Sequence, residues 1–496
     1  MNAFILVLYT YVLFVVSRGD SNNLIIHTYG IGKQIISEKL YSETASSSLH
    51  EYVDHDVNPC DNFYKFACGK WIRTQEKKYE YHTNFSIRDG NVNFDKVVLE
   101  FQQGKYKNES KIFNNLYNLH RKCNHLPSAE IFECRTEILN FGAYALSSIF
   151  IRKNKIKSEE NGDYIYVEDM IKRIKKEFRL LIDEKKHIFD EETRNNFLYK
   201  LDKMKFKRNF DEYDLSNTKE MEYCYKKFKM FFEDDFSIKL VLKNIRSIKG
   251  SLDRKNDTLD SCFGKIFNPL LLLGKYVYAN AWYRKTKNFF TFNSDVLNEP
   301  SFSAYYPMSL NYGYFGATIS HEITHAFDNG NYNRTLEGDN RNNFNVTQMS
   351  VKNFEEKIKC FIEQYGMQKD SITNININGL QTLPENIADN GGLKLAHRAY
   401  MKWLQSNGGK DIEVPGFEKF TKEQLFFISY GRKKCEYTSK DMLEKKIKTT
   451  RYPPPEIRTN VALSNYKPFS DAFNCPVNSK MNPEDKCELW KIQNQN

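Results

Sequence analysis

The spacing of apolar residues divides the chain into a helical first half and a more varied second half. From residue 90 to residue 275, apolar positions recur at helical spacing between faces rich in lysine and glutamate, which is typical of amphipathic helices. Aromatic and β-branched residues then cluster at 276–283 and 289–292, and this composition favours strands. The helical period returns at residues 311 to 330 and ends at an Asn-Gly pair, a typical helix stop. The pattern predicts a mainly helical protein with strands beside one central helix.

The first fifty residues follow a different pattern. The mostly apolar run at 4–16 is too short for a comfortable membrane span and is typical of a signal-peptide core. We therefore predict a signal peptide at 1–19 and a secreted protein with no stable membrane span after cleavage. The alternative is a membrane anchor through residues 4–16. The polar, serine-rich residues 20–51 predict a flexible stalk.

Composition narrows the class of protein. The 496 residues can bury more than one core, and 40% hydrophobic and 27% charged residues are ordinary for a globular protein. The net charge of +10 comes with no nucleic-acid-binding motif, so we expect solvated helix faces and no nucleic-acid partner. The oligomeric state stays open. Five glycosylation sequons agree with secretion: Asn84, Asn108, Asn256, Asn333 and Asn345.

Ten cysteines are too few for a disulfide scaffold, and none forms a Cys-x-x-Cys pair. Zinc binding by cysteine is therefore disfavoured, and the even number predicts bridges between distant segments. The residues alone leave the pairing open. Two of the cysteines lie in the segment 58–71, where a Pro/Asp start and aromatic residues at helical spacing predict a short, anchored helix.

The strongest chemical signal is His-Glu-Ile-Thr-His at 321–325. Residues four apart share a helix face, so His321 and His325 can bind one zinc ion. Glu322 would lie beside the metal, where a carboxylate can take a proton from zinc-activated water. The alternative is a helix with two surface histidines and a solvated glutamate.

A third ligand must come from elsewhere in the chain. After His325 the sole remaining histidine is His397, so the candidates are this residue and a carboxylate. Glu385 and Asp389 lie four apart on a second predicted helix, and one could bind zinc while the other orients a ligand histidine. His397 lies about 18 Å further along that helix and would not reach the same metal.

Two observations bear on this second helix. Thr382 and Glu385 also fit a capping box, which would give Glu385 a purely structural role. The glycines at 391 and 392 cost about 1 kcal/mol each inside a helix, and close approach of the two helices would account for them.

Several motifs together resemble the neprilysin family of zinc endopeptidases. An Asn-Pro-Cys…Ala-Cys-Gly-x-Trp pattern lies at 58–71. It is followed by Asn-Ala-Trp-Tyr at 280–283, Ser-Leu-Asn-Tyr-Gly at 309–313, the motif at 321–325, and Glu-Asn-Ile-Ala-Asp-Asn-Gly-Gly at 385–392.

The resemblance implies a mainly α, two-lobed fold. A thermolysin-like zincin catalytic lobe with a small β-sheet would comprise 52–85 and 276–496, and a shortened helical lid lobe would comprise 86–275. One zinc ion per chain would be bound by His321, His325 and Glu385.

Roles for further residues follow from the same resemblance. Glu322 would be the general base and Asp389 would orient His321. Asn280 and Ala281 would hydrogen-bond the substrate backbone, and Arg458 would bind a peptide carbonyl. The implied disulfide bridges are Cys60–Cys475, Cys68–Cys435, Cys360–Cys487 and Cys123–Cys224, with Cys134 and Cys262 paired together or free.

Three departures from the family pattern affect the expected activity. Tyr452 stands where the family has a histidine that stabilises the oxyanion, and a tyrosine hydroxyl could partly replace it. Arg432 and Lys433 replace apolar residues of the specificity pocket, so an acidic substrate residue becomes conceivable. The middle region is short, which suggests a reduced lid and a relaxed limit on substrate size.

We therefore predict a secreted zinc metalloendopeptidase that cleaves peptides with zinc-activated water and Glu322 as the base. The alternative is a zinc-bound but weakly active or inactive relative that captures peptides or proteins as a decoy. A secreted structural protein without metal is the third interpretation.

Overall fold

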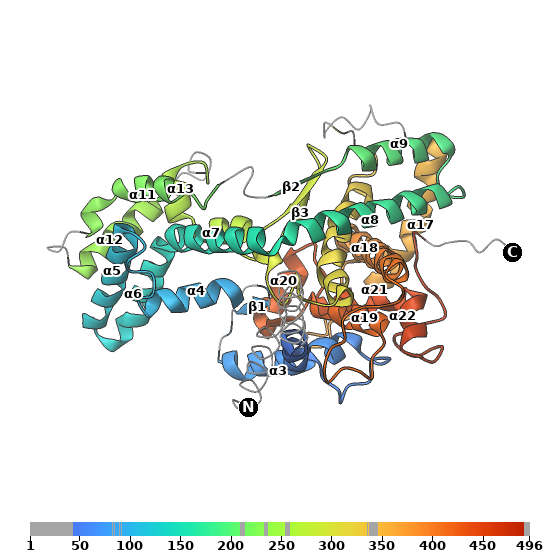
Figure 1. Ribbon diagram of the computed structural model, residues 1–496, viewed down its shortest axis with the longest axis horizontal. Coiled ribbons are helices and arrows are strands. Elements are labelled where there is room, and N and C mark those ends of the chain that lie inside the picture. The colour runs from blue at the N-terminus through green and yellow to red at the C-terminus, as the bar shows by residue number, and fades with distance from the viewer. Residues whose placement is uncertain are drawn as a thin grey trace, which may run out of the picture.

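The computed structural model describes residues 43–490 except 82, 84, 89, 91, 209–213, 233–236, 253–257, 335 and 337–345. The ribbon forms two unequal lobes, with helix α7 (Ala143–Asn161) leading from the smaller lobe toward α8 (Asp163–Glu184) in the larger one (Figure 1). The chain is mainly helical with two small sheets, so the predicted fold class is confirmed. No helix in this described part is long and apolar enough to cross a membrane.

The predicted signal peptide and most of the predicted stalk lie outside the described residues. The prediction of a flexible stalk is wrong for its last part, because residues 43–52 form a helix. Ala45 and Leu49 lie four apart among polar neighbours and are fully buried. This short apolar stripe packs into the core of the larger lobe, which orders the segment.

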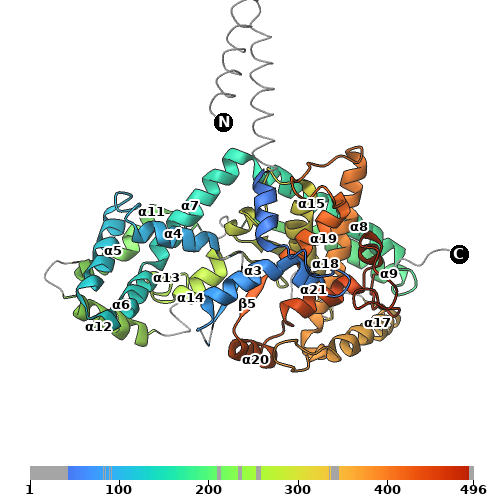
Figure 2. The ribbon, with the colours of Figure 1, turned by 90° about the horizontal axis from the view of Figure 1, so that it is seen from below.

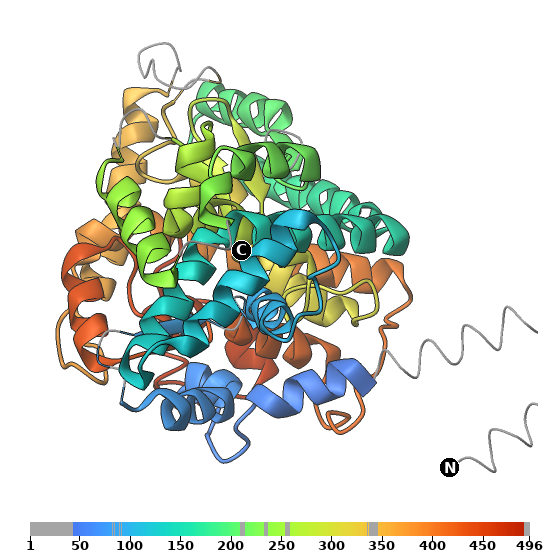
Figure 3. The same cartoon turned by 90° about the vertical axis from the view of Figure 1, so that its left-hand side faces the viewer.

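The smaller lobe is a cluster of helices around one apolar core, and Figure 3 shows it end-on. Helix α5 illustrates how the sequence forms it: Ile112, Leu116 and Leu119 recur at helical spacing and are buried. The first half of α7 supplies the centre of this core. The other helices of the lobe are α4 (Val92–Gln102), α5 (Lys111–Lys122), α6 (Ser128–Phe141), α11 (Thr218–Lys226), α12 (Ile238–Gly250), α13 (Cys262–Phe267) and α14 (Pro269–Leu272).

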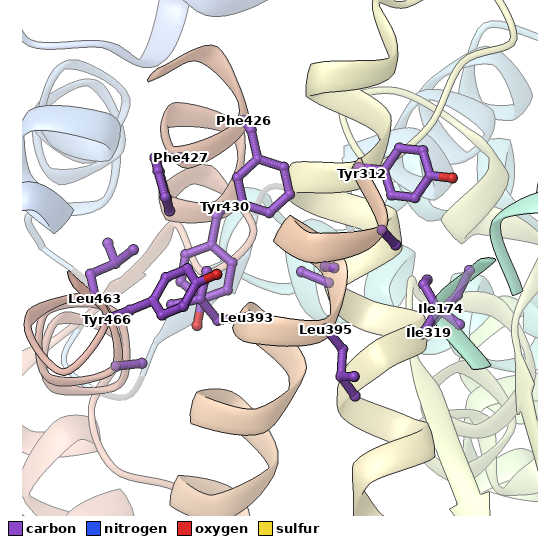
Figure 4. Packing of buried hydrophobic residues seen from close by; sticks show 14 of the residues in the cluster. Ile174, Tyr312, Ile319, Leu393, Leu395, Phe426, Phe427, Tyr430, Leu463 and Tyr466 are labelled. Atoms are coloured by element: carbon purple, nitrogen blue, oxygen red, sulfur yellow. The ribbon is translucent and has the colours of Figure 1, made fainter. Parts of the chain in front are cut away.

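The larger lobe has its own core of aromatic and aliphatic side chains, part of which Figure 4 shows between α18 and α19. Its helices include α3 (Phe63–Tyr79), α8, α9 (Glu191–Lys203), α15 (Met308–Asn311), α16 (Ala317–Thr324), α17 (Gln348–Gly366), α18 (Gly379–Ser406), α19 (Lys422–Arg432), α20 (Lys440–Thr449), α21 (Pro455–Ser464) and α22 (Lys467–Ala472). Helix α3 packs against α19 and α21 in Figure 2.

The two cores do not follow the predicted sequence boundaries at every point. Helices α8 and α9 lie within the range predicted as lid, yet Phe178 and Phe197 pack in the core of the larger lobe. The division into a catalytic lobe and a lid lobe stays a prediction about function.

The strands form two small sheets. Strand β4 (Phe289–Phe292) pairs with β2 (Lys205–Arg208) in parallel and with β3 (Ala281–Arg284) in antiparallel orientation. Strand β1 (Ser86–Arg88) pairs with β5 (Glu436–Thr438) in antiparallel orientation. The strand expected at 276–283 is wrong in its first part, because Leu273–Val277 form a π-helical turn. Tyr276 and Val277 are buried in the core of the smaller lobe, and this packing outweighs their strand propensity.

All ten cysteines are paired. The bridges Cys60–Cys475, Cys68–Cys435 and Cys360–Cys487 are those that the resemblance implied. The implied Cys123–Cys224 bridge is wrong, since the structure contains Cys123–Cys134 and Cys224–Cys262. Both bridges lie within the smaller lobe. Cys123–Cys134 joins the turn after α5 to α6, the next helix in the chain, and Cys224–Cys262 joins α11 to α13, which are in contact although α12 lies between them in sequence.

Candidate metal centre

Helix α16 and the turn that follows it present both histidines to one point. The α-helix ends at Thr324 and continues as a 3-10 turn over His325–Phe327. The Nε2 atoms of His321 and His325 lie 3.1 Å apart, and both rings are largely withdrawn from solvent. The alternative of two surface histidines is therefore wrong.

Helix α18 brings the third candidate ligand to the same point. Oε2 of Glu385 lies 3.3 Å from Nε2 of His321, and its Oε1 lies 3.8 Å from Nε2 of His325. The helix begins at Gly379, with Asn378 as its N-cap. The capping-box interpretation of Glu385 is thus wrong, because this residue lies two turns inside the helix and is fully buried.

The two helices approach so closely because of the paired glycines in α18. A Cβ atom on Gly392 would lie 2.8 Å from the backbone nitrogen of His321, and one on Gly391 would lie 2.8 Å from Cγ2 of Thr324. Real side chains do not accommodate such contacts without a shift of the backbone. The predicted reason for these glycines is confirmed.

Each histidine has a carboxylate behind its ring. Nδ1 of His321 lies 3.0 Å from Oδ1 of Asp389, and Nδ1 of His325 lies 2.8 Å from Oδ2 of Asp328. Asp328 is in turn fixed by the backbone N–H of Gly330, which donates to its Oδ1. Because an ionised carboxylate only accepts hydrogen bonds, the contact with Asp328 places the proton of a neutral His325 ring on Nδ1. Asp389 lies close enough to Nδ1 of His321 to favour the same tautomer there. Both Nε2 atoms then carry lone pairs that point toward Glu385.

Sequence reasoning missed Asp328 as an orienting group. The residue is visible three positions after His325, but its contact depends on the 3-10 turn that replaces the last helical turn.

Cations surround the two carboxylates of α18. Nε of Arg458 lies 2.6 Å from Oδ2 of Asp389, and its Nη2 lies 3.1 Å from Oε2 of Glu385. Nζ of Lys434 lies 3.0 Å from Oδ1 of Asp389. Burial raises the pKa of both carboxyl groups, but Arg458, Lys434 and His321 outweigh it and hold the pKa of Asp389 well below its usual range. The pKa of Glu385 is also lowered, by the hydrogen bond to His321 and by Arg458.

This arrangement calls for a cation between the two rings. Neutral imidazoles whose lone pairs face each other at 3.1 Å repel unless a positive charge lies between them. A proton can serve: burial lowers the pKa of His325, but Asp328, Glu385 and Glu322 raise it to about 9. Two imidazole nitrogens and one carboxylate are also a typical ligand set of a catalytic zinc ion. His321, His325 and Glu385 are the group in the described chain whose ligand atoms all lie within 4.8 Å of one another, and they fit zinc.

The metal centre opens into a cavity of about 990 Å³. Glu322 lines this cavity beside the two histidines and is mostly buried. Asn280 and Ala281 also line it. Among the described residues, β3 pairs with β4 alone and is therefore an edge strand. The structure therefore brings the predicted base and the predicted backbone-binding residues to the cavity that contains the metal site.

The remaining predicted residues differ in their surroundings. Arg458 lines the cavity while it is paired with Asp389 and Glu385, so its role in binding substrate stays a prediction. Tyr452 also lines the cavity, is 41% exposed, and accepts a hydrogen bond of 3.1 Å from Nη2 of Arg451. Arg432 is buried with its guanidinium 4.2 Å from the ring centroid of Tyr52, so its expected place in the specificity pocket is wrong.

The five candidate glycosylation sites are only partly described. Asn108 is exposed and Asn333 is half-buried. Asn84, Asn256 and Asn345 lie outside the described residues.

A His-Glu-x-x-His helix, a second helix that supplies a glutamate ligand, and a mainly helical frame define a zincin-type metallopeptidase domain. Residues 280–489 match the sequence model of peptidase family M13. This domain of the chain belongs to peptidase family M13, the neprilysin family, as the resemblance suggested.

Among curated relatives, Neprilysin-1 of Caenorhabditis elegans is 33% identical over 348 residues, which are 70% of this chain and 44% of the relative. The Endothelin-converting enzyme homolog of Locusta migratoria is 31% identical over 357 residues, 72% of this chain and 46% of the relative. Human Neprilysin is 33% identical over 325 residues, 65% and 42%. The chain thus spans less than half the length of these relatives.

Two solved structures support the fold alone. The zinc metalloprotease Zmp1 of Mycobacterium tuberculosis in its open state has a TM-score of 0.50 and 20% identity, over 72% of this chain and 52% of that one. PepO of Lactobacillus rhamnosis has a TM-score of 0.50 and 20% identity, over 71% and 50%.

Proposed function

We propose that this chain is a zinc-dependent endopeptidase that hydrolyses bonds within peptides. The observation that carries the proposal is the convergence of His321, His325 and Glu385 at one wall of a cavity that Glu322 also lines. Membership of peptidase family M13 supports it independently.

The bound zinc would polarise the scissile carbonyl and make water a stronger nucleophile. Glu322 is the general base: its carboxylate takes the proton of the attacking water and returns it to the leaving amine. Because water attacks directly, no covalent bond forms between the peptide and a side chain. Asp389 and Asp328 keep both histidine rings in the tautomer that leaves Nε2 free for the metal.

The edge strand β3 gives the peptide a place to bind. An extended peptide can add to an open strand edge through backbone hydrogen bonds. At the start of β3, Oδ1 of Asn280 accepts a hydrogen bond of 3.0 Å from the N–H of Ala281. This contact fixes the Asn280 side chain at the cavity, where its amide can donate to a substrate carbonyl.

We also propose that the protein is secreted. Five disulfide bridges suit an oxidising compartment. The apolar run at 4–16 and the exposed sequon at Asn108 are consistent with this route.

Glu322→Gln is the decisive test of the mechanism, because it keeps the shape of the side chain and removes the base. We expect this variant to contain one zinc ion per chain and to cleave a peptide library about 10²–10⁴-fold more slowly than the natural protein. Zinc content is measured by mass spectrometry of the intact protein. Glu385→Ala is the companion variant and should lose zinc.

The decoy remains the competing function, and Tyr452 in the oxyanion position favours it. The same experiment separates the two functions. Zinc-loaded natural protein that binds peptides but cleaves them no faster than Glu322→Gln would establish the decoy and refute the peptidase.

A further inference from the structure

Two lysines follow helix α19 and line the cavity. Lys433 and Lys434 form the turn between α19 and β5, and both are half-buried. The turn is fixed on both sides: Arg432 packs on Tyr52, and Cys435 is bridged to Cys68. These anchors hold the two ammonium groups on the cavity wall and give the turn little freedom to withdraw them.

The two lysines differ in their partners. Nζ of Lys434 lies 3.0 Å from Asp389. For Lys433, the described part of the chain supplies neither a hydrogen bond nor an ion pair to the ammonium. The charges that act on Lys433 are those of Lys434, Asp389, Arg458 and Glu322. The Lys433 side chain therefore lines the cavity with no counter-ion of its own among the described residues.

Burying a charged ammonium group in this position is unfavourable in free energy unless an anion pairs with it. Burial and the neighbouring Lys434 lower the pKa of Lys433 well below its ordinary range. A carboxylate in the cavity would reverse both effects, because it would replace lost hydration and offset the charge of Lys434.

The lining of the whole cavity is also rich in positive charge. Nine lysine and arginine side chains and four carboxylates line it among the described residues. Three of the four carboxylates are already engaged: Glu385 and Asp328 with the histidines, and Glu436 with Arg88. The fourth is Glu322, the proposed base. Five of the nine cations are ion-paired as well: Arg88 and Lys446 with Glu436, Arg451 and Arg458 with Glu385, and Lys434 with Asp389. The lining still has more cationic than anionic side chains, so it attracts an acidic ligand more strongly than a neutral one.

We propose that Lys433 forms an anion-binding subsite beside the metal centre, which binds the side-chain carboxylate of the peptide residue that follows the cleaved bond. The preferred substrates are peptides with Asp or Glu at that position. This inference rests on the proposed peptidase function and names the substrate class of the same cavity.

The test uses peptides that are identical except at this one position. Glu and Gln, and Asp and Asn, are pairs of nearly equal size that differ in charge, while Leu and Phe test an apolar preference. We expect the natural protein to cleave the Glu peptide with a kcat/KM about 10- to 100-fold above that of the Gln peptide, the range of a charge-assisted hydrogen bond. Mass spectrometry of the products confirms that the same bond is cleaved in every peptide.

Lys433→Met removes the charge and keeps the length of the side chain. We expect the ratio of Glu to Gln cleavage to fall to about one, with Leu and Phe peptides improved. Lys433→Arg should keep a ratio above one. The matched control is Lys285→Met, which removes an exposed lysine that lines the same cavity and should keep the natural ratio. Zinc content and thermal unfolding establish that each variant is folded.

Preferred cleavage of Leu or Phe peptides by the natural protein, or an unchanged ratio in Lys433→Met, would overturn the subsite and leave the peptidase intact. Failure of the zinc-loaded protein to cleave any peptide would overturn the proposed function instead. In that case the subsite is tested by equilibrium binding to the natural protein: tighter binding of the Glu peptide supports it, and equal binding of Glu and Gln peptides refutes it.

Discussion

At the residue scale, the phenol of Tyr452 is hydrogen-bonded to the guanidinium of the preceding residue, Arg451. Nη2 of Arg451 donates to its oxygen at 3.1 Å, and Nε of the same guanidinium lies 3.2 Å from Oε1 of Glu385. Since Arg451 occupies a lone pair of the phenol oxygen, the O–H of Tyr452 stays available as a donor. Under the proposed function, the pair would offer an oxyanion one hydroxyl donor with a cation behind it.

Substitution of Tyr452 tests this arrangement. Tyr452→Phe removes the O–H, and we expect kcat on a small peptide to fall while zinc content is retained. Tyr452→His supplies a stronger donor and should raise kcat, by at most about 10²-fold, which is the low end of the loss seen when one such donor is removed. Unchanged kcat in both variants would show that residue 452 does not contact the transition state.

The metal ligands could be predicted from the sequence because their spacing has a direct geometric meaning. His321 and His325 share one helix face, and so do Glu385 and Asp389. Asp328 could not be predicted in the same way, since its contact with His325 requires a local change from α-helix to 3-10 turn. The orientation of Arg432 could not be predicted either, because its partner Tyr52 lies 380 positions earlier in the chain.

At the scale of elements, the metal centre depends on how closely α18 can lie against α16. Gly392 lies against α16, and its missing side chain leaves room for the backbone of His321. This pairing could be anticipated from the two consecutive glycines. The π-helical turn at Leu273–Val277 could not, because its aromatic and β-branched residues have strand propensity and only the core of the smaller lobe shows them to be helical.

We expect Gly392→Ala to separate the helices. Forcing a methyl group into a packed contact costs about 1–3 kcal/mol, and here it also displaces a metal ligand. The variant should therefore unfold at lower denaturant concentration and bind zinc more weakly. Gly250→Ala is the control, since a Cβ there meets no described atom within 4 Å. Natural stability and zinc content in Gly392→Ala would contradict this account of the helix contact.

The sheet of β1 and β5 contains a carboxylate whose ionisation makes the stability depend on pH. Glu436 is buried and paired with Arg88 at 2.8 Å and with Lys446. Burial raises its pKa, but Arg88 and Lys446 outweigh this and lower it to about 2, from an ordinary value of 4.5. A carboxyl group with a lowered pKa stabilises the fold above its unfolded pKa and loses this contribution as the pH falls toward the folded pKa.

The stabilisation by Glu436 should therefore be complete above pH 4.5 and be lost between about pH 4.5 and pH 2. The shift corresponds to about 3 kcal/mol at most. We expect Glu436→Gln to flatten the pH dependence of the free energy of unfolding in that window, measured by urea denaturation. A variant whose stability falls with pH as steeply as that of the natural protein would exclude Glu436 as the source.

At the scale of the whole molecule, bridges tie the first described helices to the last. Cys68–Cys435 joins α3 to the turn that carries Lys433, and Cys60–Cys475 joins the start of α3 to the segment after α22. Such pairings were accessible from the family resemblance, but spacing alone did not indicate them. In the smaller lobe the resemblance failed, and Cys123 pairs with a residue only 11 positions away.

We expect removal of the Cys68–Cys435 bridge by a double Cys→Ala substitution to lower the free energy of unfolding by about 2–5 kcal/mol. Peptide hydrolysis should fall as well, because the bridge fixes one wall of the cavity. The control is the same substitution at Cys123 and Cys134, which should spare zinc content and hydrolysis. Equal loss of hydrolysis in both variants would contradict a specific role for the bridge at the cavity.

The two bridges to α3 also bear on biosynthesis. Cys60 and Cys68 are translated 415 and 367 positions before their partners. Neither bridge can form before its second cysteine has been translated. The cavity wall that contains Lys433 is therefore covalently fixed to α3 only late in synthesis, well after His321, Glu322 and His325 have been made.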